Sequence, residues 1–315
     1  MKIHNEVIYS NINILKNLKR INLPHVSIKS NIPGPKICLT AGVHGDEIGG
    51  CVIVQELINK LHKNQIIRGE LHAFPMLNPS GFEESTRFLN GEDLNRVFPG
   101  KENGTMAQRT AYLIFKKILE DKPELVIDIH NDWRKSIQYA AIDPKPNSTS
   151  KEIYQQTEKF AKSLAIPLIL DTDGITNSLS YHLLKNNISS IVLELGAYQI
   201  VKEREIDQGV NILLKILKDF DMIEKDIGTI EEDNRIKGKI LKYSQEPMPK
   251  RKGIARFSIV PGQIVKKGQI LIKIYSPLGN LLEVIKSPYN ALVLGYSDSS
   301  LALPGQQLIA LGVIK

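Results

Sequence analysis

Cysteine is scarce in this chain of 315 residues, which has only Cys38 and Cys51. Two cysteines cannot form the disulfide framework of a small secreted protein, so we expect buried free thiols in a reducing compartment. Long hydrophobic runs are missing as well, because no stretch of about 18 apolar residues could span a membrane. The N-terminus also lacks the apolar segment of a signal peptide. These absences favour a cytoplasmic protein with no membrane partner.

The chain carries an excess of basic residues but no basic surface pattern. Lys and Arg total 41 against 34 Asp and Glu, which gives a formal net charge of +7. The basic residues are scattered, some of them as pairs such as Lys116–Lys117 and Lys266–Lys267, and no basic stripe interleaves with aromatic side chains. The sequence therefore argues against nucleic-acid binding. A mild positive field could steer a small anionic substrate.

The first part of the chain alternates short apolar runs with longer stretches of helical periodicity. We predict strands at 36–43, 70–77, 124–130, 138–142, 167–171 and 190–196, and helices at 48–63, 105–119, 151–165 and 204–220. Alternating strands and helices predict an α/β layered domain with a largely parallel or mixed sheet. The polar segment 79–105 is predicted to be a long loop, which in a compact domain is usually functional or disordered.

The composition changes near residue 225. Residues 224–235 are polar and charged, which is typical of a linker, and short β-rich runs separated by Gly and Pro follow. This spacing predicts a small all-β sandwich or barrel. We therefore divide the chain into a catalytic α/β domain at 1–230 and a C-terminal β domain at 231–315.

The sharpest motif is His44-Gly45-Asp46-Glu47, at the end of the first predicted strand. An imidazole and a carboxylate in one tight Gly-containing turn can point at the same metal ion, and a catalytic zinc needs three such ligands with one position open. His130 ends another predicted strand, and sites assemble at the carboxyl ends of strands in open α/β sheets. Asp128 lies on the same strand face as His130 and could orient its imidazole. The alternative is that these are unrelated surface or core residues.

A carboxylate also interrupts the apolar strand at 190–196. Glu194 is costly to bury there unless it is paired or catalytic. Beside a zinc ion, it could take a proton from the attacking water and pass it to the leaving amine. A structural ion pair at the edge of the sheet is the alternative.

The loop from Arg87 to Arg96 concentrates groups that bind anions. An Arg beside the metal could stabilise the negative charge that develops on an amide carbonyl oxygen. A second Arg with an Asn amide, as in Asp93-Leu94-Asn95-Arg96, suits a planar carboxylate. The alternative for any single surface Arg is a solvated charge.

Several motifs together resemble one known family. In order they are 42–47 (GVHGDE), 78–82 (NPSGF), Arg87, 93–100 (DLNRVFPG), 128–130 (DIH) and 194–196 (ELG). The same order is seen in the succinylglutamate desuccinylase/aspartoacylase family, whose catalytic fold is similar to that of zinc carboxypeptidases. The spacing looks closest to the bacterial predicted-deacylase branch, which includes N-acetyl-diaminobutyrate deacetylases.

The resemblance implies a zinc-carboxypeptidase-like α/β/α fold with a mixed sheet and a C-terminal β domain. It implies one Zn²⁺ per chain, held by residues equivalent to His44, Glu47 and His130. It also implies that Glu194 is the general base and acid, and that Arg87 polarises the carbonyl. The carboxylate of a small-molecule N-acyl substrate is then bound by the remaining residues of the loop, Asn95 and Arg96.

Some features depart from this pattern. Asn290 and the pair Ser299-Ser300 differ from the expected turns of the β domain, and 130–133 (HNDW) is an unusual continuation after the third ligand. We expect this last segment to shape the acyl or side-chain pocket. The sequence does not define the acyl group, the amine or the oligomeric state, and a homo-oligomer stays open.

Two other functions remain open from sequence. A zinc carboxypeptidase acting on short peptides would use the same metal ligands, although a small β domain capping the site would favour smaller substrates. A carrier role is the other alternative, because the β domain resembles biotinyl or lipoyl modules. Against it, Lys266 and Lys267 lie in no Met-Lys-Met or Asp-Lys-Ala tip.

Overall fold

The computed structural model describes residues 4–16, 19–61, 66–172, 174–224, 236 and 238–314. The helices are α1 (Ile48–Leu61), α2 (Pro79–Glu83), the 3-10 turn η1 (Leu94–Arg96), α3 (Met106–Asp121), α4 (Lys151–Lys162), α5 (Leu179–Lys185) and α6 (Glu203–Asp219). The strands up to the linker are β1 (Asn5–Lys16), β2 (Lys19–Ser30), β3 (Lys36–Ala41), β4 (Glu70–Phe74), β5 (Leu125–Asp132), β6 (Lys135–Ser136), β7 (Tyr139–Ile142), β8 (Leu168–Leu170) and β9 (Ser189–Ala197). The later strands are β10 (Ile240–Ser244), β11 (Gly253–Phe257), β12 (Ile264–Val265), β13 (Ile270–Tyr275), β14 (Leu281–Lys286), β15 (Ala291–Tyr296), β16 (Leu301–Ala302) and β17 (Ile309–Val313).

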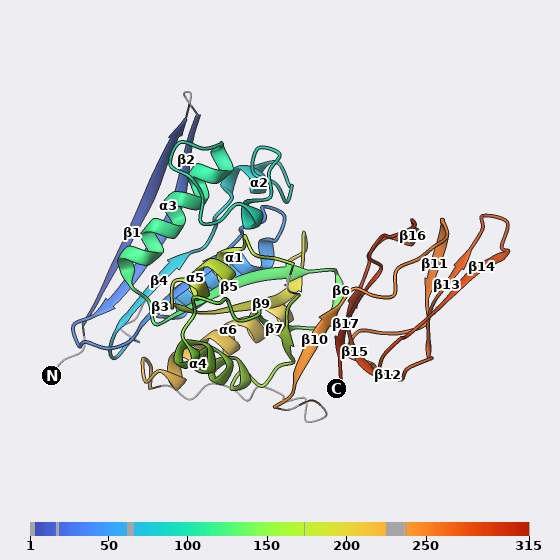
Figure 1. The fold of residues 1–315 in the computed structure, drawn as a ribbon. Coiled ribbons are helices and arrows are strands. Elements are labelled where there is room, and N and C mark those ends of the chain that lie inside the picture. The colour runs from blue at the N-terminus through green and yellow to red at the C-terminus, as the bar shows by residue number, and fades with distance from the viewer. Residues whose placement is uncertain are drawn as a thin grey trace.

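One long mixed sheet forms the centre of the protein (Figure 1). Within the described part of the chain it has thirteen strands, with β1, β2, β4, β3, β5, β9, β7, β8 and β10 following one another across it. Strands β4, β3, β5 and β9 run parallel, so their carboxyl ends meet at one edge. Strand β7 is antiparallel to β9, which makes the sheet mixed, as predicted.

Helices cover both faces of this sheet. Helices α1, α4 and α6 contribute to one apolar core, and α3 and α5 contribute to the other. Helix α6 places Ile206, Val210 and Leu213 at helical spacing on its buried side. Helix α3 begins after Thr105, whose side chain forms a capping box with Gln108 and so satisfies two donors of the first turn. The three-layer α/β/α arrangement agrees with the expectation from sequence.

The C-terminal strands do not form a separate sandwich. Strand β10 pairs in parallel with β8 and antiparallel with β17, so the central sheet continues into the C-terminal segment. A second, antiparallel sheet of β14, β13, β11 and β16 packs against β12, β15 and β17 through a shared apolar core. The sandwich is therefore present, but one of its layers belongs to the central sheet. Residues 225–235 of the predicted linker, which include the boundary at residue 230, lie outside the described residues.

The predicted strands and helices of the α/β part are all found, with ends that shift by a few residues. The antiparallel pair β1–β2, which extends the sheet beyond β4, and helix α5 were not predicted from the sequence. The segment 79–105 contains α2 and η1 and is otherwise irregular. No helix in the described ranges combines the length and apolarity needed to cross a bilayer.

Candidate metal centre and active site

The fold brings His44, Glu47 and His130 to the same edge of the central sheet. His44 follows β3, Glu47 directly precedes α1, and His130 lies near the end of β5, the strand beside β3. All three side chains are buried, with at most 5% of each residue exposed. The predicted ligands, which are as far as 86 positions apart in sequence, therefore meet because two neighbouring parallel strands end together.

Gly45 lets this turn pack closely on helix α2. A Cβ at Gly45 would lie 2.0 Å from the carbonyl carbon of Gly81, a contact that no side chain tolerates. The 42–47 and 78–82 motifs are thus two sides of one backbone contact. A glycine at 45 is required by packing, which places His44 and Glu47 on either side of it.

The Glu47 carboxylate lies between the two imidazoles. His44 Nδ1 is 2.6 Å from Glu47 Oε1, and His130 Nδ1 is 3.1 Å from Glu47 Oε2. The two rings are 5.2 Å apart between centroids. Glu47 Oε2 also accepts a hydrogen bond from the backbone N–H of Asn131, 3.1 Å away. One nitrogen of each ring therefore faces the same carboxylate.

The opposite nitrogen of each ring is held by a second carboxylate. His130 Nε2 lies 3.0 Å from Asp128 Oδ2, and Asp128 Oδ1 accepts a hydrogen bond of 2.6 Å from Thr40. His44 Nε2 lies 3.2 Å from Asp93 Oδ1. The expected orienting contact of Asp128 is present. The contact of Asp93 was not predicted, although its position in the 93–100 motif was an available signal. Carboxylates behind ligand imidazoles are the usual outer contacts of a protein zinc site.

The electrostatics of the cluster are those of tightly coupled charges. Burial alone would raise the pKa of Glu47, but the imidazoles of His44 and His130 reverse the effect and hold this pKa well below its usual range. Burial also works against a charged His130, yet Asp128 and Glu47 raise the pKa of its imidazole well above the ordinary value. The carboxylates thus favour positive charge at this point of the structure.

These residues fit a zinc ion by their chemistry. Two imidazoles and one carboxylate are the ligand set of a catalytic zinc with an open position. One donor atom from each of His44, Glu47 and His130 can be chosen so that all three lie within 4.8 Å of one another. Both imidazoles turn Nδ1 inward and are fixed from behind, as metal ligands require.

Glu194 lies beside this cluster. Its register partner on β5 is His130 and its partner on β7 is Tyr139. The Oε2 atom of Glu194 is buried and has no hydrogen-bond partner among the described residues. Burial raises the pKa of Glu194 well above its ordinary value, and the nearby carboxylates of Asp132 and Glu47 add to the shift. A carboxyl that holds a proton easily and has an oxygen without a hydrogen bond is suited to proton transfer.

The predicted anion-binding loop reaches the same place. The Arg87 guanidinium pairs with Asp93 Oδ2 at 2.9 Å and lies 3.5 Å from Glu47 Oε1. Asn95 is buried, and its Oδ1 accepts a hydrogen bond of 2.9 Å from the backbone N–H of Leu179 at the start of α5. The Nδ2 group of Asn95 is therefore the part of this side chain that can donate a hydrogen bond to a ligand. Arg96 is exposed and contacts the carbonyl oxygen of Asn95 at 2.9 Å.

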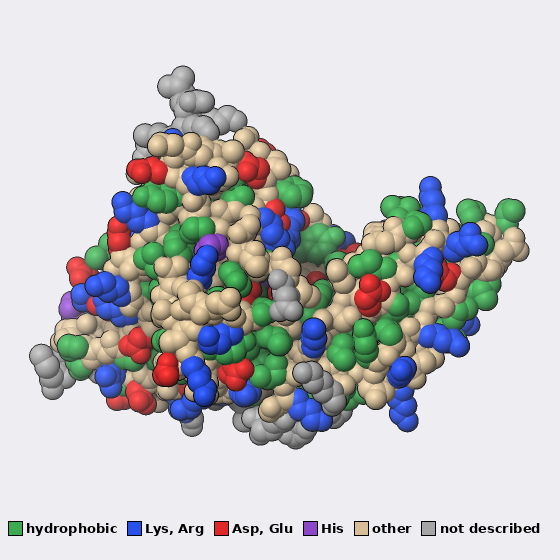
Figure 2. Space-filling view, viewed as in Figure 1, with side chains coloured by type: hydrophobic (Ala, Val, Ile, Leu, Met, Phe, Trp, Pro, Cys, Tyr) green, Lys and Arg blue, Asp and Glu red, His purple; other side chains and the backbone are tan. Residues whose placement is uncertain are grey.

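Two adjoining cavities open at this site. The first, about 190 Å³, is lined by all seven residues singled out from sequence and by Asp132, Asp143 and Asp171. The second, about 460 Å³, shares Arg96, Asp132, Asp171 and Glu194 with it and extends to Tyr243, Gln245 and Gln307 of the C-terminal part. The face drawn in Figure 2 is hollowed between the α/β body and the C-terminal strands. Asp132 belongs to the 130–133 segment that was expected to shape the pocket, whereas nothing local in the sequence marks Asp143 or Asp171.

Only part of the unusual 130–133 segment lines the cavities. Asn131 and Asp132 line the first cavity, whereas Trp133 packs in an apolar cluster and lines neither cavity. Asn131 also donates to the carbonyl of Leu195 at 2.7 Å and accepts from the backbone N–H of Gly50 at 2.9 Å, which ties β5 to β9 and α1. Both cysteines are buried free thiols, as expected.

Comparison with known proteins identifies what the chain is similar to. Residues 33–219 match the succinylglutamate desuccinylase/aspartoacylase catalytic domain. The N-alpha-acetyl-L-2,4-diaminobutyric acid deacetylase of Halomonas elongata is 31% identical over 111 residues, 35% of this chain and 32% of the relative. The succinylglutamate desuccinylase of Pseudomonas paraeruginosa is 25% identical over 195 residues, 59% of this chain and 56% of the relative. The matched segments thus span about a third and about half of these relatives.

Solved structures extend the likeness to the whole fold. The ectoine utilization protein EutE (DoeB) from Ruegeria pomeroyi superposes with a TM-score of 0.82 at 20% identity, covering 98% of this chain and 95% of that one. A succinylglutamate desuccinylase/aspartoacylase from Rhodobacter sphaeroides gives a TM-score of 0.81, also at 20% identity, with coverage of 99% and 95%. At this identity the two structures show a shared fold, which includes the C-terminal strands.

Proposed function

Because the chain belongs to the succinylglutamate desuccinylase/aspartoacylase family, we propose that it is a zinc-dependent hydrolase that removes the acyl group from a small N-acyl amino acid. The family makes it a deacylase, that is, an amidohydrolase acting on linear amides. The observation that carries the zinc-dependent reaction is the Glu47 carboxylate between the Nδ1 atoms of two buried imidazoles. Beside it lies Glu194, whose buried Oε2 has no hydrogen-bond partner among the described residues.

In this proposal His44, Glu47 and His130 hold the zinc ion. When bound, zinc supplies Lewis-acid activation of a water molecule and polarises the substrate carbonyl. Asp93 and Asp128 keep the two imidazoles in the tautomer that presents Nδ1 inward. The three ligands come from two strand ends and one helix start, so they are placed by the rigid part of the fold.

The other site residues are assigned proton transfer, stabilisation of the developing charge and binding of the substrate carboxylate. Glu194 takes the proton of the attacking water and delivers it to the nitrogen of the leaving amine. Arg87, held by Asp93, stabilises the negative charge that develops on the carbonyl oxygen. Asn95 and Arg96 bind the α-carboxylate of the substrate, to which Asn95 donates through Nδ2 and Arg96 through its guanidinium.

The larger cavity suits the side chain of the amino acid. Asp132 and Asp171 on its wall are both buried enough for their pKa values to be raised, first of all by burial. A primary amine in this cavity would allow both to ionise, so we propose a substrate that carries a second amino group. The deacetylase of Halomonas elongata, whose name specifies an acetylated diaminobutyric acid, supports this choice.

A substrate panel tests the proposal. The zinc-loaded protein is given N-acetyl amino acids with neutral, acidic and basic side chains, and release of the free amino acid is measured. We expect hydrolysis of the acetylated amino acids, with the highest kcat/KM for short basic side chains. Faster cleavage of unmodified short peptides than of any N-acetyl amino acid would contradict the proposal and indicate a carboxypeptidase.

A further inference from the structure

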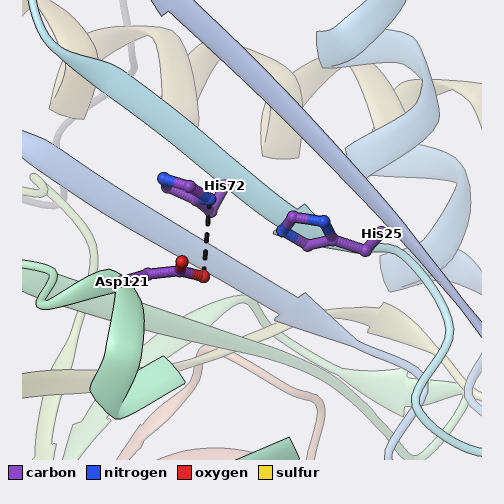
Figure 3. Close-up of side chains that lie close together, drawn as sticks. All are labelled: His25, His72 and Asp121. Atoms are coloured by element: carbon purple, nitrogen blue, oxygen red, sulfur yellow. Dashed lines mark ion pairs between the residues drawn. The ribbon is translucent and has the colours of Figure 1, made fainter. Parts of the chain in front are cut away.

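A second group of side chains outside the active site has the composition of a metal site. Within the described residues, two clusters bring three His, Cys, Asp or Glu ligand atoms within 4.8 Å of one another, and one of them is His25, His72 and Asp121. His25 lies on β2, His72 on the neighbouring β4, and Asp121 at the end of α3 (Figure 3). No residue of this cluster lines either active-site cavity.

The inner atoms of these three residues, which face one another, form no hydrogen bonds within the described part of the chain. His25 Nε2, His72 Nδ1 and Asp121 Oδ2 are all buried and accept or donate no hydrogen bond among the described residues. His72 Nδ1 and Asp121 Oδ2 lie 3.5 Å apart, and the rings of His25 and His72 stack at 5.6 Å between centroids. Apart from this ion pair between His72 and Asp121, the three buried atoms have no polar contact with the described residues, which is costly unless something binds them.

The outer atoms of the same residues are all engaged. His25 Nδ1 lies 3.1 Å from Ser10 Oγ, and His72 Nε2 lies 3.3 Å from Glu70 Oε2. Asp121 Oδ1 forms a 2.5 Å ion pair with Lys117. With protons on the outer nitrogens, each imidazole turns a lone pair inward, and Asp121 turns its free oxygen the same way. This is the outer support that ligand side chains receive in metal sites.

The protonation state of the cluster suits a cation. Burial, together with the nearby His72 and Lys117, lowers the pKa of His25 to about 4. Its imidazole is therefore neutral at pH 7 and its lone pair is available. Lys117 is a nearby positive charge that opposes a metal, but it pairs with Asp121 Oδ1 and not with Oδ2.

We propose that His25, His72 and Asp121 form a second zinc-binding site, separate from the catalytic one. Two imidazoles and a carboxylate favour zinc over calcium or magnesium, which prefer oxygen ligands. Ligand atoms around a tetrahedral zinc lie about 3.3 Å apart, so small side-chain rotations bring this cluster to the required geometry. The ion would tie β2 and β4 to the end of α3, at the part of the sheet farthest from the C-terminal strands.

Metal analysis of dialysed, zinc-loaded protein tests the second site. We expect two zinc ions per chain in the wild type, and one in each of His72→Gln, His25→Gln and Asp121→Asn. His182→Gln is the matched control, because His182 is also buried with an unpartnered Nε2 but has no carboxylate cluster. This control should retain two ions.

A catalytic-site variant separates this proposal from the function proposed above. His44→Ala should retain one ion, and adding zinc to stripped His44→Ala should raise its melting temperature. That rise should be lost when His72→Gln is added. Asp121→Asn serves if His72→Gln does not fold. A single ion in the wild type that His44→Ala removes, or unchanged zinc content in folded His72→Gln, would mean that the cluster binds water only and overturns the second site.

Discussion

His130 and Glu194 are register partners on the neighbouring parallel strands β5 and β9. Backbone pairing of this kind holds Cα atoms about 4.8 Å apart and turns both side chains to the same face. The imidazole assigned to the metal and the carboxyl assigned to proton transfer are therefore fixed to each other by the sheet. A catalytic carboxyl on a strand is positioned more rigidly than one on a loop.

Glu194→Gln should leave metal binding intact and abolish most turnover. The amide has nearly the same shape but cannot take a proton from water, so we expect kcat to fall about 100-fold or more. The measurement is kcat together with zinc content. A variant with normal zinc and near-normal kcat would show that Glu194 is structural and that another group is the base.

Arg87 and Arg96 should differ in the kinetic step they affect. Arg87→Ala should lower kcat by ~100-fold, because the charge it meets appears only as the carbonyl is attacked. Arg96→Ala should mainly raise KM, because the carboxylate is present before and during the reaction. A substrate analogue without the carboxylate is the control: it should be poor for the wild type and no poorer for Arg96→Ala. Equal efficiency of analogue and parent on the wild type would contradict the carboxylate assignment.

Asp93→Asn should weaken zinc binding although Asp93 is not assigned as a ligand. Asp93 holds His44 Nε2 at 3.2 Å and the Arg87 guanidinium at 2.9 Å, and an amide supports both less well. We expect zinc affinity to fall about 10- to 100-fold, as for other outer carboxylates. Competition with a chelator measures this, with Glu92→Gln as the neighbouring control. Unchanged affinity in Asp93→Asn would mean that the contact with His44 does not orient the ligand.

Asp143 should make the metal-free protein less stable as the pH rises. Burial raises the pKa of Asp143 from 3.8 to about 7, with Asp171 adding to the effect. The folded state thus binds this proton more tightly than the unfolded state, so stability decreases as the pH rises from about 4 to 7, and the penalty is complete above pH 7.

Asp143→Asn removes this penalty. At pH 8 the variant should be more stable than the wild type by at most about 4 kcal/mol, and the difference should vanish near pH 4. Urea unfolding at both pH values measures it, and Asp207→Asn on the exposed side of α6 should show no such trend. A difference between wild type and Asp143→Asn that is the same at pH 4 and pH 8 would contradict the assignment.

Local sequence patterns predicted that His44, Glu47 and His130 lie together, because both histidines stand at strand ends. His44 and His130 each stand near the end of an apolar run, and parallel strands place their ends together. Asp93 could not be assigned in this way, since its contact with His44 depends on how the irregular segment after α2 folds back. The same holds for Asp143 and Asp171, which reach the cavity from segments with no motif.

Long-range pairing also escaped prediction. The segment 240–244 was not predicted to be a strand, and nothing local in the sequence shows that β10 pairs with β8. This pairing brings Tyr243 and Gln307 to the larger cavity, so the C-terminal part contributes to the site as a wall. His25, His72 and Asp121 lie on three separate elements, and no spacing in the sequence relates them.

The most direct test of the zinc-dependent mechanism is hydrolysis of an N-acetyl amino acid by chelator-stripped protein to which zinc is returned. The wild type should be inactive when stripped and regain its activity with zinc. Folded Glu47→Gln should stay inactive at the same zinc concentration, because it lacks the carboxylate between the two imidazoles. Full activity in the stripped wild type, or zinc-restored activity in Glu47→Gln, would contradict the account.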